Sequence, residues 1–239
     1  MAYARAHEDA AGSGPHAGYA REMLDLTAVL AGLLPDEPEV LAFAALVRFA
    51  EARRPARLDA DGAMIPLAEQ DPRRWNRALI ADADALLRRA ARLNRPGPRQ
   101  LRAALHGAWA LRRSLAEAPP WETLLALYDL LLQAGEDPFV RLNRAVLLAE
   151  VAGPAAALAE VEALDADRLD DFQPYHAVKA DLLARLGRVE EALGAYDRAL
   201  DMAPGEAERL WLIRRRADML HTDKLPDLPG ECRGPDGER

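Results

Sequence analysis

Cysteine is almost missing from this sequence. Cys232 is the only one among 239 residues, so no disulfide can form within the chain, and a reducing compartment is indicated. No apolar run approaches the roughly 18 residues that a membrane span needs. The first residues also lack the apolar stretch of a secretory signal. We therefore expect a cytoplasmic protein with no membrane partner.

Lysine is nearly missing as well. Lys179 and Lys224 are the only two, and arginine supplies the rest of the 31 basic residues, against 39 acidic ones. The resulting net charge of −8 argues against a general nucleic-acid binder, which normally presents a basic surface. We expect no direct binding of nucleic acid, although a local arginine cluster could bind a small anion.

Aromatic residues make up only 5% of a chain that is 50% hydrophobic, so alanine and leucine must do most of the packing. Together with arginine and glutamate they favour helix, and we predict an all-α fold. Asp71 followed by Pro72 is typical of a helix cap and first turn. Apolar spacing and proline or glycine breaks predict helices over 18–33, 38–52, 72–93, 99–116 and 205–221.

The helical pattern breaks between residues 53 and 71. Asp61-Gly62 is a turn signal, which predicts one short β-hairpin or ordered loop over 57–67. A calcium-binding loop with Gly62 at its sixth position would need a glutamate where Ala68 stands, so we reject a calcium site there.

The C-terminal half repeats itself. Tyr128 and Tyr196 stand in the same Tyr-Asp context 68 residues apart, which is twice the 34-residue period of TPR helical hairpins. Gly187 fits the turn between the two helices of the best repeat. The matching positions of that repeat, which begins near Gln173, are Ala180, Leu183, Leu186, Gly187, Glu191, Ala192, Tyr196, Ala199 and Pro204. We predict stacked helical hairpins that are TPR-like in this half.

These signals divide the chain into four parts. They are a flexible leader over 1–17, an N-terminal helical subdomain with the hairpin insert over 18–118, TPR-like helical repeats over 119–221, and a disordered tail over 222–239.

Complete catalytic or metal-binding motifs are missing. The histidines form no close ligand pair, and nucleophile elbows and phosphate-binding glycine loops do not occur. We expect no metal and no cofactor, identify no catalytic residue, and lean against an enzyme. If the chain is an enzyme, a cofactor-free cyclase or isomerase that acts by shape and hydrogen bonding fits best.

Polar and aromatic side chains gather around the non-helical segment. Arginine forks suit carboxylates and phosphates, so the cluster could line a small-molecule site between the N-terminal helices and the repeats. The alternative is an Arg–Asp network that pins the hairpin onto the helices. The ligand-binding candidates are Arg53, Arg54, Arg57, Asp59, Asp61, Gln70, Arg74, Trp75, His106, Trp109 and Tyr128.

A stack of helical hairpins also offers a concave groove. Polar side chains on its inner helices could hold a peptide carboxylate, and ordinary surface polarity is the alternative. The peptide-groove candidates are Asn143, Arg144, Tyr175, His176 and Lys179.

Several sequence blocks occur in an order that is typical of one family. They are Leu34 to Leu41, Ala52 to Gly62, Gln70-Asp71 with Trp75, Arg77 to Ala81, Gly97-Pro98 with Gln100-Leu101, Ala126 to Asp129, and Leu142 to Val146. Over roughly 20–220 the chain resembles the TPR-like C-terminal extension of ECF-type RNA polymerase sigma factors. The sigma region 2 and region 4, which engage the polymerase and the promoter, have no counterpart in it, so we expect no promoter recognition by this chain alone.

The resemblance implies a protein-interaction or regulatory module in bacterial transcription, whose partner is a sigma core or RNA polymerase. The alternative is a stand-alone, repurposed member that binds a small molecule or catalyses a cofactor-free cyclisation or isomerisation in specialised metabolism. A monomer and an oligomer are both compatible with the sequence.

Overall fold

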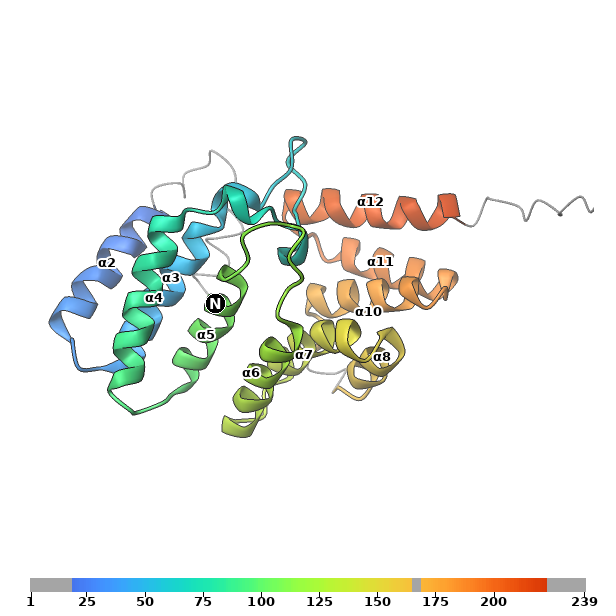
Figure 1. Cartoon of the computed structure of the whole chain (residues 1–239). Helices are drawn as coiled ribbons and strands as arrows, with labels where there is room; N and C mark the ends of the chain where they lie inside the picture. The colour runs from blue at the N-terminus through green and yellow to red at the C-terminus, as the bar shows by residue number, and fades with distance from the viewer. Residues whose placement is uncertain (1–18, 165–168, 223–239) are drawn as a thin grey trace, which may run out of the picture.

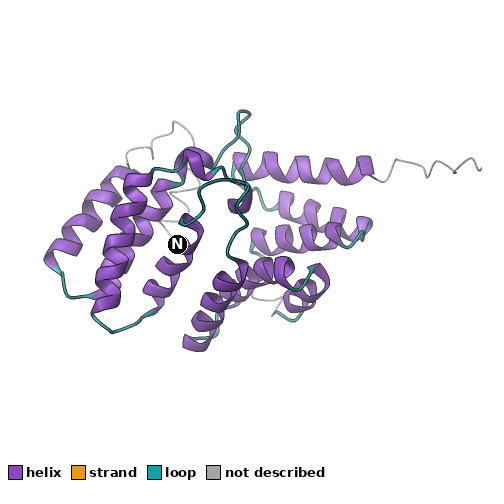
Figure 2. Ribbon diagram, viewed as in Figure 1, coloured by secondary structure: helices purple, strands orange, loops and turns teal. Residues whose placement is uncertain are grey.

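The computed structural model describes residues 19–164 and 169–222. The predicted leader over 1–17 lies outside this range, as do Cys232 and, apart from Thr222, the predicted tail. Within it the chain is helical and contains no strand (Figures 1 and 2), which confirms the all-α fold of helical hairpins. No helix among these residues is long and apolar enough to cross a membrane.

The helices follow one another with short connections, except between α3 and α4. The N-terminal half contains α2 (Tyr19–Leu33), α3 (Pro38–Ala52), α4 (Arg77–Arg92) and α5 (Pro98–Ala110). The C-terminal half contains α6 (Trp121–Ala134), α7 (Pro138–Val151), α8 (Pro154–Glu162), α10 (Gln173–Arg185), α11 (Val189–Asp201) and α12 (Glu206–Thr222). Between α3 and α4 lie three short 3₁₀ turns, η1 (Arg54–Ala56), η2 (Leu67–Glu69) and η3 (Pro72–Arg74).

Helix α3 is the centre of the N-terminal half, because α2, α4 and α5 all pack against it. Its small side chains Ala42 and Ala45 are fully buried beside Phe49, where Ala83 of α4 and Ala103 of α5 meet them. Alanine allows close helix approach and carries no side-chain entropy cost. The apolar composition of 38–52 is therefore explained by burial on several sides.

The hairpin of α10 and α11 matches the prediction closely. Gly187 turns between the helices with φ +72, a conformation that glycine adopts at no steric cost. Ala180 and Ala199 are fully buried, and Tyr196 packs with them against Leu212 of α12. The chain thus stacks each pair of helices on the next, and α12 closes the series (Figure 1).

Two predicted helix boundaries are wrong. Asp71 caps only the turn η3, because the side chain of Asn76 accepts hydrogen bonds from Ala78 N (3.1 Å) and Leu79 N (3.2 Å) and so starts α4 at Arg77. Helix α5 ends at Ala110 rather than at residue 116, where Arg77 Nη1 donates a hydrogen bond to the carbonyl oxygen of Ala110 at 3.0 Å.

The predicted hairpin is an ordered loop with a single antiparallel bridge between Leu58 and Met64. Gly62 makes the turn with φ +84, and the Asp59 carboxylate accepts the backbone N–H of Ala63 at 2.9 Å. The loop reaches from the N-terminal half to the first turn of α12 (Figure 1), where Met64 N donates to Ala207 O at 2.9 Å. The predicted division of the chain near residue 118 stays a prediction.

The N-terminus of α5 is capped by a side chain from α3. The carboxylate of Glu39 accepts hydrogen bonds from Arg99 N (3.0 Å) and Gln100 N (3.2 Å). A β-carbon at Gly97 would lie 2.5 Å from Glu39 Oε1, so the glycine leaves the room that this cap needs.

We predict opposite effects for two glycine substitutions. Gly97→Ala displaces the Glu39 cap and should lower the free energy of unfolding by about 0.5–2 kcal/mol. Gly32→Ala, in the exposed part of α2 with nothing within 4 Å, should raise it by about 0.5–1 kcal/mol. Urea denaturation measures both, and a stabilising Gly97→Ala would contradict the capping role.

Candidate ligand-binding site

Residues 57–70, here named the bridging segment, join the two halves of the molecule. Arg214 of α12 pairs with both Asp59 and Asp61, and Arg215 Nη2 lies 2.8 Å from Glu69 Oε1. Desolvation raises the pKa of Asp59, but hydrogen bonds from Arg214 and two backbone N–H groups outweigh it and hold that pKa below its usual value. Each exposed pair is weak alone, but together they fix the segment along α12.

Two arginines hold the other end of the bridging segment and the turn that follows it through backbone carbonyl oxygens. Buried Arg112 donates from Nη1 to Ala68 O and from Nε to Glu117 O, both at 3.0 Å. Half-buried Arg77 donates from Nη2 to Pro72 O (3.0 Å) and Arg112 O (2.8 Å). Burial lowers the pKa of both guanidiniums. The two guanidiniums thus donate hydrogen bonds to carbonyl oxygens that have no partner within a regular helix or sheet.

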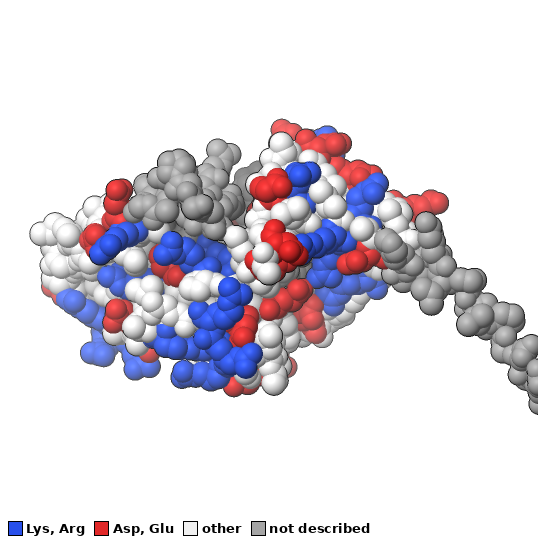
Figure 3. Space-filling view, turned by 90° about the horizontal axis from the view of Figure 1, so that it is seen from above, with Lys and Arg blue, Asp and Glu red and all other residues white. Residues whose placement is uncertain are grey.

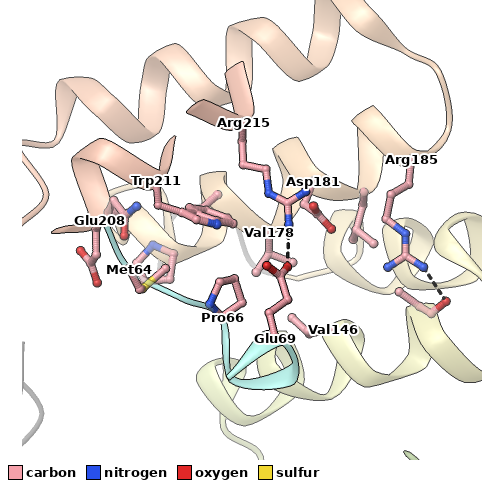
Figure 4. Close-up of a pocket in the computed structure, with 15 residues that line it drawn as sticks. Met64, Pro66, Glu69, Val146, Val178, Asp181, Arg185, Glu208, Trp211 and Arg215 are labelled. Carbon is pink, nitrogen blue, oxygen red and sulfur yellow. Dashed lines mark hydrogen bonds and ion pairs between the residues drawn. The ribbon is translucent and has the colours of Figure 1, made fainter. Parts of the chain in front are cut away.

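A cavity of about 360 Å³ lies between the bridging segment and helices α7, α10 and α12 (Figure 4). Its walls are mainly apolar, with five charged side chains among them. The lining residues are Met64, Pro66 and Glu69 of the bridging segment, Val146 and Ala149 of α7, Gln173, Pro174, Ala177, Val178, Asp181, Leu182 and Arg185 of α10, and Glu208, Trp211 and Arg215 of α12.

One face of α10 forms the main wall of this cavity. Pro174, Ala177, Val178 and Asp181 recur at the three- and four-residue spacing that places side chains on one side of a helix. This face is turned toward the bridging segment (Figure 4). Met64 and Pro66 of the bridging segment form another wall of the cavity (Figure 4).

Asp181 is a charged group of the cavity that lacks a direct partner. Its half-buried carboxylate makes no hydrogen bond or ion pair with any residue in the described part of the chain. The nearby guanidiniums have closer carboxylates: Arg215 pairs with Glu69 at 2.8 Å, and Arg185 pairs with Glu150 at 2.6 Å. Burial raises the pKa of Asp181, although Arg215 and Arg185 act to lower it.

None of the predicted ligand-binding residues lines this cavity. Arg53 Nη2 lies 2.9 Å from His106 Nδ1, and burial raises the pKa of Tyr128 while Arg102 and Arg53 act to lower it. The structure thus brings Arg53, His106 and Tyr128 together where α3, α5 and α6 meet. Trp109 packs edge-on against Trp121 in the same region.

Most of the other candidates have structural partners. Arg54 pairs with Glu51 at 3.3 Å, and Arg57 donates to Ala50 O at 2.8 Å. Gln70 donates to Ile65 O at 3.0 Å, Trp75 is buried, and Arg74 is exposed. The alternative interpretation of the cluster is an Arg–Asp network that holds the loop on the helices. Such a network exists, but its arginine is Arg214 of α12 and not one of the predicted arginines.

The five peptide-groove candidates also lie off the cavity-lining faces. Arg144 is held by Asp129 and Glu160, each at 2.6 Å. Tyr175 and His176 are buried edge to face with centroids 5.1 Å apart. Asn143 donates to the carbonyl of its own helix at Phe139, and Lys179 follows the same side of α10 as Tyr175 and His176. A peptide groove built on these residues stays a prediction.

Charge is distributed without a single basic stripe on the face shown in Figure 3. Lys and Arg are more numerous over the N-terminal half, and both signs are interspersed over the C-terminal half. In the ranges 19–164 and 169–222, no group of three or more His, Cys, Asp or Glu residues could hold a metal ion.

Comparison with known proteins gives two matches of unknown function. Residues 1–91 match a family of unknown function, DUF6596. The chain is 40% identical over 207 residues to an uncharacterized protein of Rhizobium meliloti (strain 1021). This alignment covers 87% of the chain and 48% of that protein, so the chain spans about half the length of the curated relative that it matches.

We predict that Asp181→Asn stabilises the protein at neutral pH. The raised pKa of Asp181 means that the folded state disfavours the ionised carboxylate. Above the folded-state pKa, this ionisation lowers the free energy of unfolding of the unaltered protein by its full amount. This destabilisation disappears as the pH falls toward the ordinary value of 3.8, because the folded state then binds the extra proton. Thermal unfolding of both proteins across this range should show the advantage of the variant shrinking. Asp201→Asn, exposed on α11, is the control, and an advantage that grows on acidification would contradict the prediction.

We also predict that Arg112→Lys lowers the free energy of unfolding by about 1–3 kcal/mol. A lysine ammonium cannot replace both of the separate donors that reach Ala68 O and Glu117 O. Arg113→Lys at the exposed neighbouring position should change stability by less than about 0.5 kcal/mol. Equal effects of the two variants in urea denaturation would show that the carbonyl contacts contribute little.

Proposed function

We propose that this chain is a protein-interaction module that regulates transcription, of the kind found in the TPR-like C-terminal extension of ECF-type sigma factors. Its partner is a sigma core or RNA polymerase. The paired helices α7–α8 and α10–α11, followed by α12, support a TPR-like arrangement. The relative of about twice the length also supports a role alongside a further domain.

The observation that carries this proposal is an exposed apolar stripe on α2. Leu26, Val29 and Leu33 are 52%, 57% and 71% exposed, and their spacing places them along one side of the helix. The opposite side packs on α3 through Thr27 and Ala31, both of which are buried. An apolar stripe on an edge helix is typical of a surface that packs against another protein or domain.

The partner surface can be tested by binding assays with two immobilised proteins. One is RNA polymerase core enzyme of Rhizobium meliloti, and the other is the portion of the Rhizobium relative that lies outside the alignment. We predict that this chain binds one of them and that Leu33→Glu weakens the binding at least about tenfold, because a buried leucine contributes about 1.5–3 kcal/mol.

Leu111→Glu is the matched control, since Leu111 is also 71% exposed and lies at the end of α5. It should leave the binding unchanged, and circular dichroism should show that both variants fold. Failure of the unaltered chain to bind either protein, or equal loss for both variants, would contradict the proposal.

A second function, small-molecule binding, is supported by the cavity beneath the bridging segment. Its volume of about 360 Å³ falls within the range of about 300–1,000 Å³ that small-molecule sites occupy. Apolar walls with a few placed polar groups are also typical of such sites. In this role the bridging segment forms one wall of the site and helices α7, α10 and α12 form the others.

A further inference from the structure

We propose that this cavity binds a small amphipathic amine, with its protonated amino group on Asp181 and its apolar body against α7, the bridging segment and Trp211. This inference rests on the second function proposed above and names its ligand class.

The unpartnered carboxylate of Asp181 determines the charge of the ligand. A half-buried carboxylate is costly unless a cation or hydrogen-bond donor contacts it directly. Among the described residues Asp181 makes no ion pair or hydrogen bond, because the nearby Arg215 and Arg185 pair with Glu69 and Glu150. Figure 4 shows it among the lining side chains on the wall formed by α10. An ammonium group that enters the cavity would supply both the charge and the donors.

An anionic ligand fits the same cavity less well. Arg215 and Arg185 already hold Glu69 and Glu150 at 2.8 and 2.6 Å, so an anion would have to displace a carboxylate from one of them. The lining also contains more acidic than basic side chains, because Asp181, Glu69 and Glu208 face two arginines. An amine meets a free acceptor and leaves both ion pairs intact.

The remaining walls define the body of the ligand. Met64, Pro66, Val146 and Val178 present apolar surface, and the ring of Trp211 adds an aromatic wall that already carries the guanidinium of Arg215 at 5.5 Å from its centroid. The volume of about 360 Å³ is near the lower limit for small-molecule sites. A single ring with a short alkyl chain therefore suits the cavity better than a peptide segment.

Three probes of one shape test the charge requirement: 4-phenylbutylamine, 4-phenylbutan-1-ol and 4-phenylbutyrate, each titrated calorimetrically into the full chain at pH 7.5. We expect the amine to bind at least about tenfold more tightly than the other two. Asp181→Asn should weaken the amine by about 10- to 100-fold, as for loss of a charged hydrogen bond, and leave the alcohol unchanged. Asp201→Asn should have no effect.

A cavity-filling variant, Ala177→Phe, tests whether the probes bind in this cavity. It should abolish the binding of all three probes, and circular dichroism should show that the variant is folded. Equal affinity for amine and alcohol, or full amine affinity in Asp181→Asn, would overturn the amine inference and leave small-molecule binding standing. If the butyrate binds most tightly, the amine inference is wrong and the cavity binds anions through Arg185 or Arg215. If no probe binds the folded, unaltered chain, both the inference and the second proposed function are wrong.

Discussion

The donation of arginine N–H groups to backbone carbonyl oxygens is the interaction on which this structure depends. The residues between α3 and α4 form no regular helix or sheet, so many of their carbonyl groups have no ladder to pair with. Arg77 and Arg112 provide several fixed donors each and connect this segment to the end of α5. The bridging segment is held on one side in this way and on the other by α12, and the cavity between them exists because both attachments are made.

Local features of the fold follow directly from the sequence. The helix over 38–52 could be predicted because its apolar residues and initial proline are local signals, and the turn at Gly187 because glycine adopts positive φ freely. The start of α4 was harder, since Asp71 and Asn76 are both good caps. Both caps form, Asp71 on η3 and Asn76 on α4, and the partners of Arg77 that hold this corner, Ala110 and Arg112, lie far along the chain.

The candidate site was predicted only in outline. The sequence predicts a small-molecule site between the N-terminal helices and the repeats, lined by the polar cluster. The cavity in the structure lies instead between the bridging segment and helices α7, α10 and α12. The bridging segment lines it through Met64, Pro66 and Glu69 rather than through the arginines of that cluster. On α10, one residue of shift rotates a side chain by about 100°, which separates Tyr175 and His176 in the core from Pro174 and Ala177 in the cavity. Composition does not reveal which face turns inward, because that depends on how the helices stack. No local signal pairs Arg214 with Asp59.

The contact between the bridging segment and α12 joins residues that are 155 positions apart in the chain. Arrays of helical hairpins usually contact only their neighbours, so they can unravel from an end one repeat at a time. Here the last helix is fastened to the first half, and fraying of α12 also releases the loop on which it rests. We therefore expect unfolding at the two places to be coupled, and folding to be slower than in an open stack, because this contact closes a long loop of chain.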